Sequence, residues 1–135
     1  PTRDPPLVTR APQVVSEIAR VEPMAVALAH GDTASLAAIM QASHASLRDD
    51  YEVTVPEVDA LAKVVGEALH DGDTPLGGVR MTGAGFGGCL VAVVRRSAAQ
   101  KVLDAVKLTY NADAEIPASA DFYEMAGGAR EISRN

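Results

Sequence analysis

The feature that most constrains the fold is a glycine-rich stretch between two apolar segments. Four glycines stand at positions 83, 85, 87 and 88, just before the apolar run Cys89–Val94. Glycine tolerates positive φ and carries no Cβ, so such a loop brings its backbone amides close to an anion or to another loop. The pattern predicts a strand, a glycine loop and a second strand. A plain hairpin turn that happens to be rich in glycine explains it as well.

Two well-known nucleotide motifs do not fit this loop. A Walker A motif needs Lys followed by Ser or Thr after the glycines, and neither is present. Gly83, Gly85 and Gly88 satisfy G-x-G-x-x-G, but a strand follows where a dinucleotide-binding motif needs a helix N-terminus. The glycine loop therefore lies between two strands and matches neither of these nucleotide-binding motifs.

The order of elements predicts an α+β fold. Residues 1–12 contain four prolines, so we expect an extended leading segment or linker, followed by one domain over residues 13–135. Segments whose apolar residues have helical spacing come first, and strands, a further helix and a last strand follow them. We expect a mainly antiparallel sheet of three to four strands, covered by helices. The expected helices are 13–31, 32–46, 54–68 and 98–110, and Pro23 should kink the first of them or divide it into two short helices. A loop is expected over 70–78, and the last strand over 121–126.

Two helix starts carry capping signals. Asp32 or Thr33 is a suitable N-cap for the second helix, whose inner side we assign to Leu36, Ile39, Met40 and Ser43. Thr54 and Glu57 have the spacing of a capping box at the start of the third helix.

Charge and composition exclude several classes of partner. The 18 acidic and 12 basic residues give a formal charge of −6, which argues against nucleic acid or an anionic membrane surface as partner. No segment is apolar over a length that crosses a bilayer, so a cytoplasmic location is expected. We expect no metal site, because the three histidines are widely spaced and Cys89 is the only cysteine.

A second informative stretch covers residues 43–59 and is dense in polar and ionisable side chains. It is typical of a helix end followed by a solvated connection. The residue types also allow a Ser-His-Asp hydrolase, but Ser43 and His44 are adjacent and no strained nucleophile turn is present.

These two stretches together resemble one known family. R-M-T-G-A-G-F-G-G-C at residues 80–89 is similar to the third signature motif of the GHMP kinases, in the form found in galactokinases. S-H-A-S-L-R-D-D-Y-E-V at residues 43–53 and P-E-V-D at 56–59 resemble the galactokinase pattern at the corresponding spacing. Phe122-Tyr123 and Gly128-Ala129-Arg130 fit its ending, so the resemblance runs from about Val14 to Arg130. Pro23 and the polar stretch 71–75 depart from the family pattern.

The resemblance implies the C-terminal, ferredoxin-like domain of a galactokinase. That family transfers the γ-phosphoryl group of ATP to the anomeric hydroxyl of galactose, giving galactose 1-phosphate, with Mg²⁺ between phosphate oxygens. It places the catalytic Asp, the Mg²⁺ ligands and the main phosphate loop in the N-terminal kinase domain. The implied partners are therefore galactose, ATP and that domain. We expect no catalytic residue in this chain, and no activity from it alone.

The resemblance also implies roles for two groups of residues. The glycine loop would lie beside the phosphate loop, either supporting it or contacting phosphate directly: Thr82, Gly83, Ala84, Gly85, Phe86, Gly87 and Gly88. A second group would make interdomain or capping contacts, or border the sugar pocket: Arg48, Asp49 and Asp50. We expect Cys89 to be a small buried residue rather than a nucleophile.

Two other functions remain open at this point. One is a related GHMP kinase acting on an N-acetylated sugar, an isoprenoid alcohol or an amino-acid hydroxyl. The other is a stand-alone binding or regulatory module that kept the fold without the chemistry.

Overall fold

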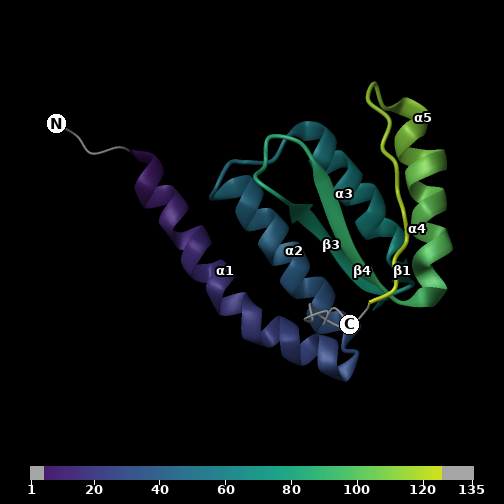
Figure 1. Ribbon diagram of the computed structural model, residues 1–135, viewed down its shortest axis with the longest axis horizontal. Helices are drawn as coiled ribbons and strands as arrows, with labels where there is room; N and C mark the ends of the chain where they lie inside the picture. The colour runs from purple at the N-terminus through teal and green to yellow at the C-terminus, as the bar shows by residue number, and fades with distance from the viewer. Residues whose placement is uncertain (1–4, 126–135) are drawn as a thin grey trace, which may run out of the picture.

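The structure is a computed structural model that describes residues 5–125. Figure 1 shows a hairpin of two strands with α2 on one side and α3 on the other, α1 beyond α2 and α4 beyond α3. The helices are α1 (Pro5–His30), α2 (Thr33–Asp49), α3 (Pro56–Ala68), α4 (Ala99–Ala105) and α5 (Asn111–Asp113), with a 3-10 turn η1 (Arg96–Ala98) and a π-helical turn η2 (Val106–Tyr110). The strands are β1 (His70–Asp71), β2 (Thr74–Pro75), β3 (Gly77–Thr82) and β4 (Cys89–Val94).

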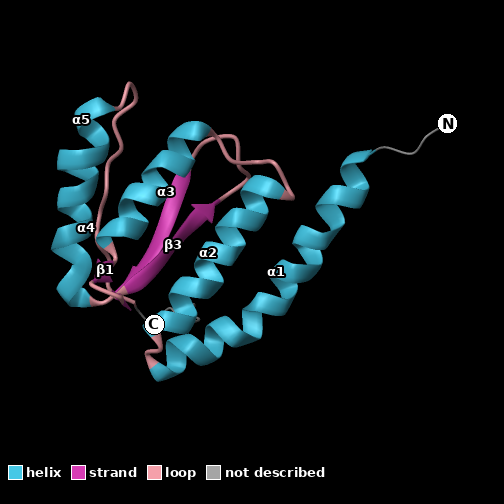
Figure 2. Cartoon of the chain, turned by 180° about the vertical axis from the view of Figure 1, so that it is seen from behind, coloured by secondary structure: helices cyan, strands magenta, loops and turns pink. Residues whose placement is uncertain are grey.

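The strands form two antiparallel hairpins. β1 pairs with β2, and β3 pairs with β4 from Gly77↔Val94 to Thr82↔Cys89. This confirms an α+β fold with antiparallel strands and a glycine loop between two of them, as Figure 2 shows. The four described strands are divided between two sheets rather than joined in one.

The expected last strand over 121–126 does not form within the described residues. Residues 121–125 have no regular secondary structure, and Phe122 and Tyr123 are 44% and 82% exposed. The chain turns back after α5, where the Asn111 side chain exchanges two hydrogen bonds with the backbone of Ala118 (2.8 and 2.9 Å). Aromatic residues favour a strand only when they can pair with an edge, and residues 121–125 pair with none of the described strands. Residue 126 and the expected Gly128-Ala129-Arg130 motif lie outside the described residues.

The expectation of an extended segment up to residue 12 is also wrong for its described part. Residues 5–12 are the first turns of α1, because Pro5 and Pro6 occupy positions whose amides have no partner in any helix. Residues 1–4 lie outside the description. Pro23 does not divide α1 into two helices; α1 continues through it and changes direction along its length (Figure 1).

The buried side chains gather where helices meet the β3–β4 hairpin. Gly78 lets α2 approach β3 closely, since a Cβ there would lie 3.0 Å from the Ala37 Cα and the Met40 Sδ. Three buried clusters result: Ala27, Leu36 and Met40; Val53, Val58 and Met81; and Val65, Leu69, Ala98 and Val106.

The inner side assigned to α2 is largely correct. Leu36, Met40 and Ser43 are buried, and Ile39 is partly buried against the same cluster.

A row of apolar residues on α1 and one residue of β4 face outward. Val14, Ile18 and Val21 of α1 are 48%, 69% and 67% exposed. Cys89 of β4 is exposed, which corrects the expectation that it is buried. Helical or strand spacing identifies an apolar face but does not say which neighbour covers it.

One of the two predicted caps is confirmed. The Asp32 side chain accepts from the Ser35 amide at 3.0 Å, as an N-cap should. The Thr54 and Glu57 capping box is absent, because Val55 is the N-cap of α3 and the Thr54 hydroxyl donates to Asp59 instead.

Candidate functional site

The glycine loop between β3 and β4 has a backbone that ordinary residues rarely adopt. Gly83, Gly85, Gly87 and Gly88 have φ between 90° and 118°, and Phe86 has φ 59°. The loop surrounds an open hollow lined by residues 82–89. The Phe86 side chain is 74% exposed at its tip. A glycine-rich backbone at positive φ can present amides to an anion or to another loop.

The tip of this loop is held by the connection between α2 and α3. The Phe86 amide donates to the Val53 carbonyl at 2.6 Å. A Cβ on Gly85 would lie 2.6 Å from both the Cβ and the carbonyl oxygen of Val53, far inside normal contact. The glycine is therefore required by the approach of the two segments as well as by its positive φ.

The strand that leads into the loop is held by His44 of α2. The ring is buried, its Nδ1 accepts from the Met81 amide at 3.1 Å, and its Nε2 lies 3.1 Å from Asp59 Oδ1. These partners assign the ring proton to Nε2, which donates to the Asp59 carboxylate. The sequence placed His44 in a family motif but gave it no role, because Met81 lies 37 residues away.

A Ser-His-Asp hydrolase does not fit this geometry. Both ring nitrogens of His44 have partners, and neither partner is a hydroxyl. The Ser43 hydroxyl donates to the carboxylate of Glu17, 2.8 Å from either oxygen, and not to the neighbouring histidine. A nucleophile needs a base within hydrogen-bond reach, so Ser43 is not activated here.

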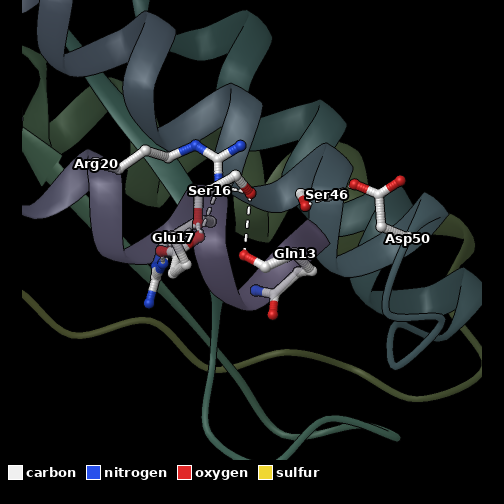
Figure 3. Close-up of polar contacts among 8 residues, drawn as sticks. Gln13, Ser16, Glu17, Arg20, Ser46 and Asp50 are labelled. Atoms are coloured by element: carbon white, nitrogen blue, oxygen red, sulfur yellow. Dashed lines mark hydrogen bonds and ion pairs between the residues drawn. The ribbon is translucent and has the colours of Figure 1, made fainter. Parts of the chain in front are cut away.

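Glu17 is the centre of a second polar cluster that ties α1 and α2 to β3. The Arg80 guanidinium donates to Glu17 and, at 2.5 Å, to the Ser43 hydroxyl. Arg20 donates to the other Glu17 oxygen at 3.0 Å. Figure 3 shows Ser16, Glu17 and Arg20 gathered on α1, with Ser46 at the neighbouring α2. Adjacent residues of α2, Ser43 and His44, thus contact adjacent residues of β3, Arg80 and Met81.

The environment of Glu17 favours its charged form. Burial acts to raise the pKa, but the Ser43 hydrogen bond and the Arg80 charge outweigh it, so the pKa lies below its ordinary value. Sequence reasoning missed this residue, since nothing near Glu17 in the chain signals a partner 63 positions later.

The three charged residues proposed to border the interface lie at the end of α2, and the Phe86 amide of the glycine loop bonds to Val53, not to any of them. Arg48 and Asp49 are exposed and pair with each other through two hydrogen bonds of 2.7 and 2.9 Å. That pairing lowers the pKa of Asp49. Asp50 accepts from the Ser46 hydroxyl at 2.8 Å, and its amide closes α2.

A larger groove of about 580 Å³ runs between α2 and α3 over β3. Its lining mixes the charges of Arg48, Lys63, Asp59 and Glu67 with small residues, and this mixture indicates no one class of ligand. Among residues 5–125, no group of three or more His, Cys, Asp and Glu side chains is arranged to hold a metal ion. Over the same range, no helix has the length and apolar character that a membrane span requires.

Two comparisons with known proteins bear on this geometry. The family model described as "GHMP kinases C terminal" matches residues 24–112. The crystal structure of Lactococcus lactis galactokinase complexed with galactose is similar to this chain, with 38% sequence identity and a TM-score of 0.71. That match covers 86% of this chain and 29% of the galactokinase chain, so this chain spans less than a third of that relative's length.

Proposed function

The chain belongs to the GHMP kinase family as its C-terminal domain, and we propose that it is the C-terminal part of a galactokinase acting in the cytoplasm. Such an enzyme transfers the γ-phosphoryl group of ATP to the anomeric hydroxyl of galactose. The observation that carries the proposal is 38% identity with a galactokinase over 86% of this chain. The remaining machinery of the reaction belongs to the N-terminal part of the longer protein.

The glycine loop is the element of this domain that we assign to the phosphate end of the reaction. Phosphoryl transfer depends mostly on positioning and on stabilising charge around the moving group. A loop with five residues at positive φ presents backbone amides to phosphate oxygens or to the loop that holds them. Its hollow is open, and Val53 fixes its tip.

The glycine loop by itself does not supply the ligands of a magnesium ion. Mg²⁺ requires near-octahedral oxygen ligands, usually including one or two carboxylates, and residues 82–88 carry none. We therefore assign Mg²⁺ and the catalytic base to the rest of the longer protein. Arg48, Asp49 and Asp50, exposed or partly exposed at the end of α2, are assigned to contacts with that part rather than to chemistry.

The test is acceptor-dependent turnover by the full-length protein. We expect galactose 1-phosphate from ATP and galactose, and little product with N-acetylgalactosamine, mevalonate or homoserine. Phosphorylation of one of these others with galactose untouched would replace galactokinase by another GHMP kinase. No turnover with any acceptor would favour a binding or regulatory module. The 135-residue chain alone should show no kinase activity. Turnover by it would contradict the assignment of the catalytic groups to the N-terminal part.

A further inference from the structure

Asp59 connects the two points at which the glycine loop is held. Its Oδ1 accepts from His44 Nε2 and its Oδ2 accepts from the Thr54 hydroxyl, each at 3.1 Å. Beyond His44 lies the Met81 amide, one residue before the loop. Beyond Thr54 lies Val53, whose carbonyl accepts from Phe86 at the loop's tip. One carboxylate therefore orients both the start and the tip of the loop.

We propose that His44 and Asp59 form a positioning pair that sets the glycine loop for phosphoryl transfer, an inference that rests on the kinase function proposed above. Neither residue lines the hollow of the loop, so neither is placed to touch a substrate there. They act through the backbone amide of Met81 and the carbonyl of Val53. The His44 side chain is 11% exposed and Asp59 29% exposed, and both lie at the groove between α2 and α3, so the hydrogen bond between them is only partly shielded from water.

The environment of the pair supports positioning rather than bulk packing alone. Met81 is fully buried beside Val53 and Val58, which already provide the apolar contacts of this region. A histidine adds little apolar area there, but it supplies an acceptor at Nδ1 and a donor at Nε2 in one rigid ring. Small displacements of groups that position a phosphoryl group reduce rates by about tenfold to a hundredfold.

Three substitutions of His44 separate the acceptor from the volume it fills. In His44→Asn, the side-chain oxygen lies near the place of Nδ1 and still accepts from Met81. In His44→Gln, the polar end lies near the place of Nε2 and the Met81 amide loses its acceptor. We expect His44→Gln and His44→Ala to lower kcat at least about tenfold, with His44→Asn within about threefold of wild type. The KM for galactose should stay within about twofold in all three.

These kinetics are measured in the full-length protein, well below the thermal transition of each variant and per folded molecule. A purely structural role would lower thermal stability but leave kcat of the folded fraction unchanged. Equal kcat values for His44→Asn and His44→Gln would overturn the positioning pair.

A second readout needs no catalysis. Amide hydrogen exchange of residues 81–88 should accelerate about tenfold or more in His44→Ala and Asp59→Ala, because each variant loses hydrogen bonds that fix the loop. Asp59→Asn keeps an oxygen that accepts from His44 Nε2 and gains an amide group that can donate to the Thr54 hydroxyl, so exchange should stay near wild type. Residues 99–105 serve as the internal control.

The two readouts distinguish the proposals. Unchanged exchange over residues 81–88 in His44→Ala overturns the positioning pair whatever the acceptor is. Absence of galactose phosphorylation by the wild-type protein overturns the kinase assignment, and with it the catalytic purpose of the pair, while accelerated exchange would still support the mechanical link.

Discussion

The amide of Phe86 donates to the carbonyl of Val53 at 2.6 Å, which joins the tip of the glycine loop to the connection between α2 and α3. The two segments are far apart in sequence and belong to different signature stretches. Their contact explains why the spacing of glycines in the loop is not arbitrary. A side chain at Gly85 would occupy the space that Val53 already fills.

Gly85→Ala and Gly83→Ala form a matched pair that tests this contact. Both positions have φ near 90°, so the backbone strain of an added Cβ is similar, about 1–2 kcal/mol. Only at position 85 does the Cβ meet another segment, which should cost about 1–3 kcal/mol more. We expect a lower thermal midpoint for Gly85→Ala and about a tenfold lower kcat than for Gly83→Ala. Equal behaviour of the two variants would mean that the loop tip does not rest on Val53.

Glu17→Gln tests the polar cluster through its dependence on pH. The folded state lowers the pKa of Glu17, so its carboxylate stabilises the fold above the ordinary value of 4.5, and this contribution is lost as the pH falls through the folded pKa. The variant keeps the shape but loses the charge, and should cost about 1–3 kcal/mol at pH 7. The difference in thermal midpoint between wild type and variant should shrink below pH 4.5.

The control for that experiment lies on the same helix. Glu22 is exposed, so Glu22→Gln should change stability by no more than about 0.5 kcal/mol. A gap between wild type and Glu17→Gln that stays undiminished at every pH down to acid unfolding would contradict the role of the charge.

Two further glycines should respond to alanine in opposite directions. Gly66 lies inside α3 with only the Val79 Cγ1 within 4 Å of a new Cβ, at 3.9 Å, so Gly66→Ala should stabilise by about 0.5–1 kcal/mol. Gly78→Ala brings a Cβ to 3.0 Å from α2 and should destabilise by about 1–3 kcal/mol. Chemical denaturation of both variants checks the sign, and a stabilised Gly78→Ala would contradict the close approach of α2 to β3.

Leu69→Ala tests the cluster that joins α3 to the C-terminal helices. Leu69 is 1% exposed and packs with Val65, Ala98 and Val106. Loss of its side chain leaves a cavity and should cost about 2–5 kcal/mol, seen as a lower denaturation midpoint. Lys63→Ala, at an exposed position of α3, should stay within about 0.5 kcal/mol of wild type. A similar small effect at Leu69 would mean that the cluster relaxes around the vacancy.

Local features of the chain were predictable from sequence, and contacts between distant segments were not. The glycine loop between strands and the Asp32 cap follow from residue types and spacing over a few positions. The Thr54 capping box is absent because Asp59, two residues beyond Glu57, accepts from the Thr54 hydroxyl and is itself bonded to His44. Glu17 and Arg80 meet only because α1 and β3 both pack on α2, which no local pattern records.

The exposed apolar residues also show that sequence spacing does not predict which elements pack together. Ile18 has helical spacing with its apolar neighbours, yet it is 69% exposed in the described structure. Periodicity establishes that such a face exists, while its partner depends on the arrangement of whole elements. Cys89 was misplaced for this reason, since an apolar run alone does not say which face of the hairpin is covered.

The hold on the glycine loop has a consequence for the thermodynamics of ligand binding. Residues 83–88 are fixed near their start by His44 and at their tip by Val53, before any ligand is present. The conformational entropy of these residues is therefore lost when the domain folds rather than on contact with the phosphate that we propose as its ligand. A ligand that meets such a loop retains the full enthalpy of its new hydrogen bonds, with little offset from ordering the receptor.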